Sequence, residues 1–213
     1  MNLQEYLETN FYTRSELMRL AALSAAEFTR FQELRMMPAA SYTLRGAVTC
    51  TSFFGHQADS IELQYYARGY VEWLDLLKQS KGTDAAFALF RERYRNKITE
   101  LMAQGFRSSH EKVTIGLDAH IHTEWVHFLN GIYGLCTRSG LPEDIAAKEL
   151  AITIINEVTS DEKSVEADPL ALERLRAAVD LLDQASSAFA PHEVERSSRN
   201  RLITQMRAKY SLT

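Results

Sequence analysis

The fold of the N-terminal part is decided by residues 11–42, FYTRSELMRLAALSAAEFTRFQELRMMPAASY. Thr13 precedes a helical pattern and Glu16 follows three residues later, which is the capping box in which each side chain satisfies an orphan amide at a helix start. Ser24 can cap a second helix, and Pro38 stops it. The stretch therefore predicts two short helices that are joined by a tight turn.

The rest of the chain is expected to be almost entirely helical. Residues 41–54, SYTLRGAVTCTSFF, have β-formers on both sides of Gly46-Ala47, which predicts a short hairpin. Residues 59–81 are predicted to form an aromatic helix. Further helices are expected over residues 85–104, 120–133, 141–158 and 169–189, with a last one from residue 191. We therefore expect an all-α protein, with a helix-turn-helix and short hairpin in residues 1–56 and a multi-helix bundle in residues 57–213.

The composition limits the classes of function. Nine Gly and four Pro in 213 residues are few breakers, which favours long helices. The formal charge of −4 gives no overall attraction to nucleic acid, so binding would need a local basic patch. No window holds the roughly 18 consecutive apolar residues of a membrane span. The start lacks a secretory pattern, and the two cysteines, Cys50 and Cys136, are expected to be reduced thiols, so we expect a cytoplasmic protein without a membrane partner.

Residues 11–42 resemble the N-terminal DNA-binding module of MerR-type regulators, with the predicted hairpin as its wing. The resemblance is carried by Tyr12-Thr13, Glu16-Leu17, the turn Ala22-Leu23-Ser24, Phe28, Phe31 and the exit Met36-Met37-Pro38. It implies that the second helix enters the major groove of duplex DNA while side chains around it hold phosphates. The residues that the resemblance assigns to phosphate contact are Arg14, Arg19, Thr29, Arg30 and Arg45.

The module also departs from that family. Ala22 stands where the family has a turn glycine, and the second helix begins Ser24-Ala25-Ala26-Glu27 where the family usually has an arginine and then a threonine. Glu27 would lie close to phosphate, where like charge lowers affinity. Two interpretations stay open: a DNA-reading module, or a helix-turn-helix that serves packing or partner docking.

A histidine-rich helix is predicted within residues 117–138, LDAHIHTEWVHFLNGIYGLCTR. His120, Glu124 and His127 follow one another at i, i+4 and i+7, so their side chains share one helix face. Two imidazoles and a carboxylate can bind Zn²⁺ or another first-row metal. The alternative is a solvated histidine face without metal. Gly131 and Gly134 indicate a close approach of backbone or the end of this helix.

An aromatic set lies in the predicted helix 59–81, about a turn apart: Tyr65, Tyr66, Tyr70 and Trp73. Such side chains pack a core, or they line a pocket for a small organic ligand. No motif of a phosphate loop, a nucleophile elbow or a paired-cysteine site is present, so the sequence assigns neither a catalytic group nor a cofactor.

The whole chain, through SFFG and WVHFLNGIYGLCT, looks like an uncharacterised bacterial family that is associated with natural-product gene clusters. The leading hypothesis is a non-enzymatic bacterial regulatory or binding protein, with a MerR-like module for duplex DNA and a helical domain that senses a ligand or forms a homodimer. The alternative is an accessory protein or metal-assisted enzyme of natural-product biosynthesis, in which the helix-turn-helix is an inert scaffold.

Overall fold

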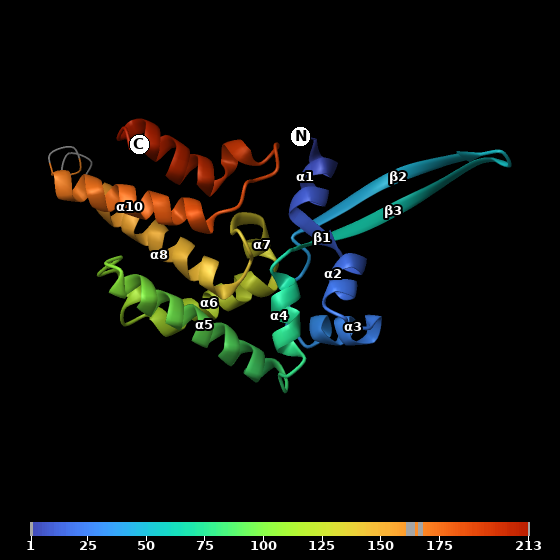
Figure 1. The fold of residues 1–213 in the computed structure, drawn as a ribbon, viewed down its shortest axis with the longest axis horizontal. Helices are drawn as coiled ribbons and strands as arrows, with labels where there is room; N and C mark the ends of the chain where they lie inside the picture. The colour runs from blue at the N-terminus through green and yellow to red at the C-terminus, as the bar shows by residue number, and fades with distance from the viewer. Residues whose placement is uncertain (1, 161–164, 166–167, 213) are drawn as a thin grey trace.

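The N-terminal part combines a helix-turn-helix with a three-stranded antiparallel sheet. The structure, a computed structural model, describes residues 2–160, 165 and 168–212. Its first elements are α1 (Leu3–Asn10), β1 (Phe11–Thr13), α2 (Arg14–Leu20), α3 (Ala25–Glu33), β2 (Tyr42–Ser52) and β3 (Gly55–Ala67). The strand order is β1-β3-β2, so the short strand before the helix-turn-helix pairs with the returning strand of the hairpin (Figure 1).

The predicted capping box at Thr13 and the predicted helix cap at Ser24 are confirmed. The Thr13 hydroxyl accepts from the backbone N–H of Glu16 at 3.3 Å, and Glu16 Oε2 accepts from the backbone N–H of Thr13 at 2.8 Å. Ser24 and Glu27 form the same reciprocal pair at 3.2 and 2.8 Å. Ala22, in the turn between α2 and α3, has a φ of +47°, a left-handed conformation that costs a non-glycine residue about 1–2 kcal/mol.

The hairpin is long, and the prediction of a short one is wrong. β2 and β3 have 11 and 13 residues, and their register runs from Tyr42↔Tyr65 to Ser52↔Gly55. The turn lies at residues 53–54, and Gly46-Ala47 lies inside β2. We call residues 44–63 the arm, because this part of the hairpin projects away from the rest of the molecule (Figure 1).

The predicted aromatic helix 59–81 and the all-α fold class are therefore also wrong. Its first part, residues 59–67, belongs to β3, and only α4 (Tyr70–Leu77) within it is an α-helix. Ile61, Leu63 and Tyr65 alternate with polar residues along β3, a period of two that suits a paired strand. The fold is mixed, with mostly helical content and one antiparallel sheet. The expected domain boundary between residues 56 and 57 falls inside β3.

The remaining chain is helical. It contains α5 (Thr83–Ala103), a 3₁₀ turn (Glu111–Val113), α6 (Leu117–Leu129), α7 (Ile132–Cys136), α8 (Pro142–Thr159) and α10 (Pro169–Ala185). A second 3₁₀ turn (Val194–Arg196), a π-helical segment (Asn200–Thr204) and α11 (Gln205–Lys209) follow. Helix α8 packs against both α5 and α10, and most of its apolar side chains are buried (Figure 1). No helix in the part of the chain that the structure describes is long and apolar enough to cross a membrane.

One hydrophobic core joins the helix-turn-helix to the helical part. Trp73 of α4 is fully buried, and its indole N–H donates to the Met36 carbonyl at 2.9 Å. On its other side the indole packs edge-on against Phe128 of α6, with ring centroids 5.0 Å apart. A close backbone approach supports the junction: Gly131 has a φ of +76°, and a Cβ there would lie 2.7 Å from the Ala39 carbonyl oxygen. This confirms the approach that Gly131 predicted.

The aromatic residues that were considered for a ligand pocket are core residues. Tyr65 and Tyr66 lie on β3, whereas Tyr70 and Trp73 lie on α4, so they do not share a helix. Each is at most 2% exposed. Tyr65 belongs to a separate small cluster with Tyr6 of α1. The set therefore offers no surface to a ligand.

Candidate metal centre

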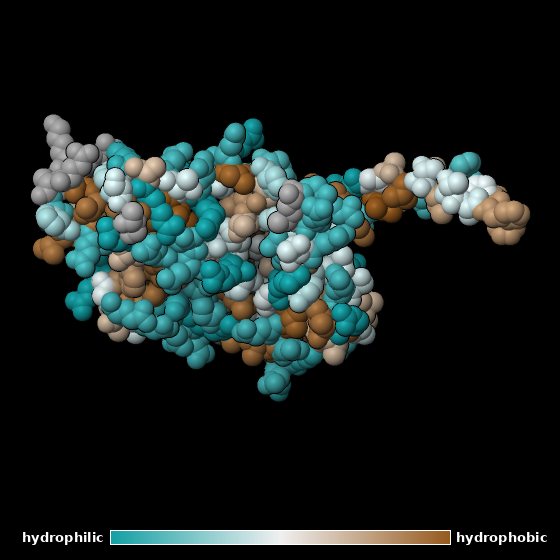
Figure 2. All heavy atoms as spheres, turned by 45° about the horizontal axis from the view of Figure 1, so that its top comes forward, coloured by the Kyte–Doolittle hydropathy of each residue, from teal (hydrophilic) through white to brown (hydrophobic). Residues whose placement is uncertain are grey.

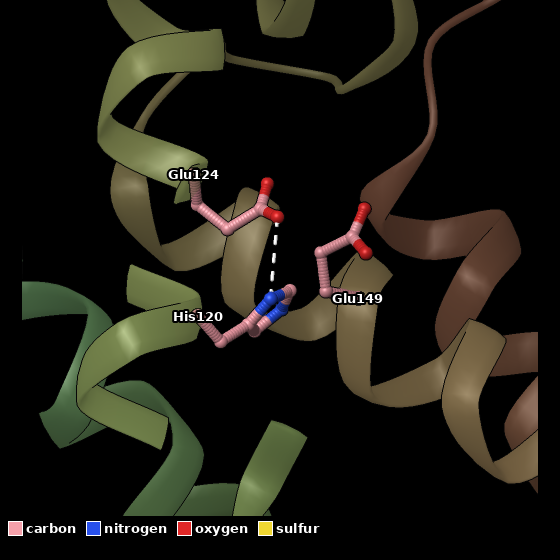
Figure 3. A group of neighbouring side chains, drawn as sticks. All are labelled: His120, Glu124 and Glu149. Carbon is pink, nitrogen blue, oxygen red and sulfur yellow. Dashed lines mark ion pairs between the residues drawn. The ribbon is translucent and has the colours of Figure 1, made fainter. Parts of the chain in front are cut away.

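Three ligand-type side chains from two helices converge beside α6. His120 and Glu124 lie one turn apart on α6, and Glu149 lies on α8. One nitrogen or oxygen of each lies within 4.8 Å of the corresponding atoms of the other two. Figure 3 shows the three side chains pointing toward one another across the space between the helices. This geometry, within the described residues, suits a single cation at their centre.

Two of these side chains are buried with polar atoms that lack a partner. His120 is 8% exposed and Glu124 is 3% exposed. Their closest contact, His120 Nδ1 to Glu124 Oε1, is 3.4 Å (Figure 3). His120 Nε2 and Glu124 Oε2 have no hydrogen-bond partner among the described residues. Because buried polar atoms are nearly always paired in folded proteins, these two atoms indicate a ligand or a water at this position.

The converging groups form part of the wall of an open cleft of about 550 Å³. The cleft is bounded by α6, by the loop before it and by Glu149 of α8. The other polar and aromatic residues of its wall are His110, Glu111, Lys112, Thr123, His127 and Tyr133. A cation held by the three side chains would therefore be reachable by a small molecule from the solvent side.

A buried lysine positions Glu149. Lys148 is 7% exposed, and its Nζ donates to Glu149 Oε1 at 3.1 Å. The same ammonium group lies 5.6 Å from the ring centre of Tyr133, a cation–π contact. The Tyr94 ring lies edge-on to His120 at 6.3 Å, and its buried hydroxyl also lacks a partner among the described residues.

The environment shifts the proton affinities of the two buried groups in opposite directions. Burial, reinforced by the negative charge of Glu149, raises the pKa of Glu124 to about 8. Burial lowers the pKa of His120, although Glu149 opposes that shift. At neutral pH and without a cation, His120 is therefore neutral and Glu124 is mostly protonated.

The structure brings together two of the three predicted ligands, His120 and Glu124. His127 is partly exposed, and its Nδ1 lies 3.5 Å from Glu124 Oε2, so it contacts the carboxylate from outside the converging trio. Glu149 was missed because its position depends on the packing of α8. The available signal was the pair Lys148-Glu149, two charged residues inside the otherwise apolar run IAAKELAITII.

The residues expected to hold DNA phosphates lie partly on the helix-turn-helix and partly on the arm. Arg14 donates to the Thr29 hydroxyl at 3.2 Å and lies over the Phe28 ring at 5.1 Å, so it packs on α3. Arg45 lies on the arm and pairs with Glu62 at 2.8 Å.

Arg19 lies in the last turn of α2, and Arg30 lies on the exposed side of α3. Glu27 and Glu33, three positions before and after Arg30, are also exposed, so two carboxylates accompany this guanidinium group on α3.

Comparison with known proteins identifies only a family. A family model described as "Family of unknown function (DUF6058)" matches residues 86–211, more than half of the chain, so the protein belongs to this family. No curated protein and no solved structure matches the chain. The matched range contains His120, Glu124 and Glu149, whereas the helix-turn-helix and the arm precede it.

The raised pKa of Glu124 predicts how stability depends on pH. Between its ordinary value of 4.5 and about 8, the folded protein keeps a proton that the unfolded chain releases. The free energy of unfolding of the metal-free protein should therefore fall as pH rises from 6.5 to 8, by roughly 1 kcal/mol per pH unit. Below 6.5 the lowered pKa of His120 acts in the opposite direction.

Urea unfolding at a series of pH values, with a chelator present, measures this slope. The Glu124→Gln variant, which cannot ionise, serves as the control and should lose the slope. Equal slopes in the two proteins would contradict the assignment of the raised pKa to Glu124.

Proposed function

We propose that this protein binds a first-row divalent cation, most simply Zn²⁺, through His120, Glu124 and Glu149, and presents it to a small molecule in the cleft. The observation that carries the proposal is a pair of buried atoms without a hydrogen-bond partner among the described residues, His120 Nε2 and Glu124 Oε2, beside a third ligand-type group. A cation would satisfy groups whose burial is otherwise costly.

The donor set suits such a cation. One imidazole and two carboxylates match the nitrogen and oxygen ligands that zinc accepts, and three protein ligands with an open position are typical of catalytic rather than structural zinc sites. A cation there would polarise a carbonyl or phosphoryl oxygen or lower the pKa of a bound water. This supports a metal-assisted role, the alternative that the sequence raised for natural-product biosynthesis.

The surrounding residues have supporting roles in this proposal. Lys148 fixes one oxygen of Glu149, and His127 contacts the outer oxygen of Glu124. Such contacts orient ligands and tune their basicity without touching the metal. The positive charge of Lys148 also favours the ionised form of Glu124, the form that binds a cation.

Substitution of single ligands tests whether Glu149, as in the structure, or His127, as predicted from the sequence, is the third ligand. Isothermal titration of metal-free protein with Zn²⁺ should give one site per chain. His120→Ala and Glu149→Gln should each weaken binding well over about 100-fold, whereas His127→Ala should weaken it only about tenfold, as expected for a residue that supports a ligand.

Thr123→Ala, a change on the cleft wall away from the trio, is the matched control and should bind like the parent protein. Co²⁺ absorption in the visible range gives an independent readout of coordination. Binding that is unaffected by His120→Ala and Glu149→Gln would refute the proposed site.

Zinc affinity should depend on pH through Glu124. This carboxyl must lose its proton to coordinate, so affinity should fall about tenfold for each pH unit below about 8, down to about 6.5. His120, whose pKa is lowered, adds no dependence in that range. In Glu124→Gln the residual affinity should be flat with pH. The measurement is titration in buffers of low metal affinity, and a parent protein with a flat profile would exclude Glu124 as a ligand.

A second candidate function is duplex-DNA binding by the N-terminal module. It is favoured by the order β1-α2-α3-β2-β3, a helix-turn-helix followed by a wing-like hairpin, in the segment that resembles MerR-type regulators. Arg14, Arg19 and Arg30 would contact phosphates in this proposal, and Arg45 with Thr29 would add to them. The regulatory hypothesis depends on this contact surface.

Mobility shift of a genomic duplex at two salt concentrations tests it. With about three phosphate contacts, the logarithm of the binding constant should fall with the logarithm of salt concentration with a slope of about −2.7. Arg14→Ala with Arg19→Ala should reduce that slope, whereas Arg91→Ala on α5 is the matched control. No shift at 50 mM salt would exclude DNA binding and leave the module as a docking or packing element.

A further inference from the structure

The arm has one apolar and one polar face. In the paired register, one face carries Leu44 with Leu63, Gly46 with Ile61, Val48 with Asp59, and Cys50 with Gln57. The opposite face carries Arg45 with Glu62, Ala47 with Ser60, Thr49 with Ala58, and Thr51 with His56. The alternation is that of a sheet with one face packed against other protein and one face in water.

Little of the described chain covers the apolar face. At the base, Tyr42 and Leu44 join the cluster that α1 covers. Farther out, Val48, Ile61 and Leu63 are each 37–38% exposed. At the tip, Phe53 and Phe54 are 95% exposed and contact each other edge-on at 5.3 Å. Figure 2 shows hydrophobic residues along the arm and at its tip.

An isolated two-stranded hairpin is at best marginally stable in water. Its apolar face therefore calls for a partner. No lysine or arginine lies on this face or at residues 53–54, so the apolar face and the tip offer no charge attraction to anionic lipid or to nucleic acid. Asp59 is the one charged residue of the face, and its Oδ1 accepts from the backbone N–H of Ser60 at 2.7 Å.

The size of the surface matches a protein–protein interface. Residues 44–52 span about 30 Å, and two strands are about 10 Å wide, which gives a face of about 300 Å². Two exposed phenylalanines add roughly 300–500 Å². Each copy would bury roughly 600–800 Å², close to the ~800 Å² per partner of stable interfaces.

We propose that the apolar face and Phe tip of the arm pair with the same surface of a second copy of this chain. A second copy supplies a surface of identical length and hydrophobicity, as an interface around a two-fold axis requires. The apolar face is continuous with the cluster under α1, so the pairing extends an existing hydrophobic surface. The arm is thus a homodimerisation element, independent of any metal in the cleft.

Sedimentation equilibrium of the full chain over a concentration series tests this. The parent protein should be a dimer at micromolar concentration. Val48→Lys with Ile61→Lys, on the apolar face, should raise the dimer dissociation constant at least about 100-fold, and Phe53→Ser with Phe54→Ser should also weaken the dimer.

The matched control is Thr49→Lys with Ala58→Lys, which adds the same charges to the opposite face of the same strands and should leave the dimer intact. Circular dichroism should be unchanged in all variants, because the substituted side chains are exposed. A parent protein that is still monomeric at about 100 μM, where a dimer with a micromolar dissociation constant would be nearly fully formed, would overturn the proposal. Equal weakening by both lysine pairs would also overturn it, as would co-sedimentation of a monomeric parent protein with phosphatidylcholine vesicles, which would assign the face to lipid.

Discussion

The indole of Trp73 connects the two parts of this molecule. Its N–H binds the carbonyl at the exit of the helix-turn-helix, and its ring packs on Phe128 of α6. Loss of the ring would leave both a cavity and an unpaired carbonyl, and each of these lowers the free energy of unfolding. The aromatic core around Trp73 thereby sets the position of α6, and with it the positions of His120 and Glu124 on that helix.

At the candidate metal centre, this packing keeps a carboxyl group buried. Glu124 is only 3% exposed, so its carboxyl group would not ionise at neutral pH without compensation, and its raised pKa expresses that cost. The neighbouring helix α8 places a second carboxylate nearby and supplies Lys148 to hold it. Apolar residues at these positions would give a more stable folded state. The retained charges therefore argue for a function of the cleft rather than for stability.

The parts that could be predicted from the sequence were those set by local interactions. The capping box at Thr13 involves residues three positions apart, and His120 with Glu124 lie within one helical turn, so spacing alone predicted both. The arm could not be predicted in the same way, because β3 owes its extended conformation to pairing with β2. Glu149 lies 25 positions beyond Glu124, and only the packing of α8 brings it to the cleft. Where tertiary contacts decide, a short aromatic stretch such as residues 61–66 suits a helix or a strand equally well.

The boundaries of the family match separate the two proposals along the chain. The match begins at residue 86, after α4, so the cleft and its three ligand-type residues belong to the part that defines the family. The helix-turn-helix and the arm precede it, yet they share the hydrophobic core with it through Trp73. A module that shares a core cannot swing freely on a linker, so whatever the arm or α3 binds is held in a fixed orientation to the cleft. Pairing of two arms would accordingly fix the positions of two clefts relative to each other, because each N-terminal module is packed against its own helical part.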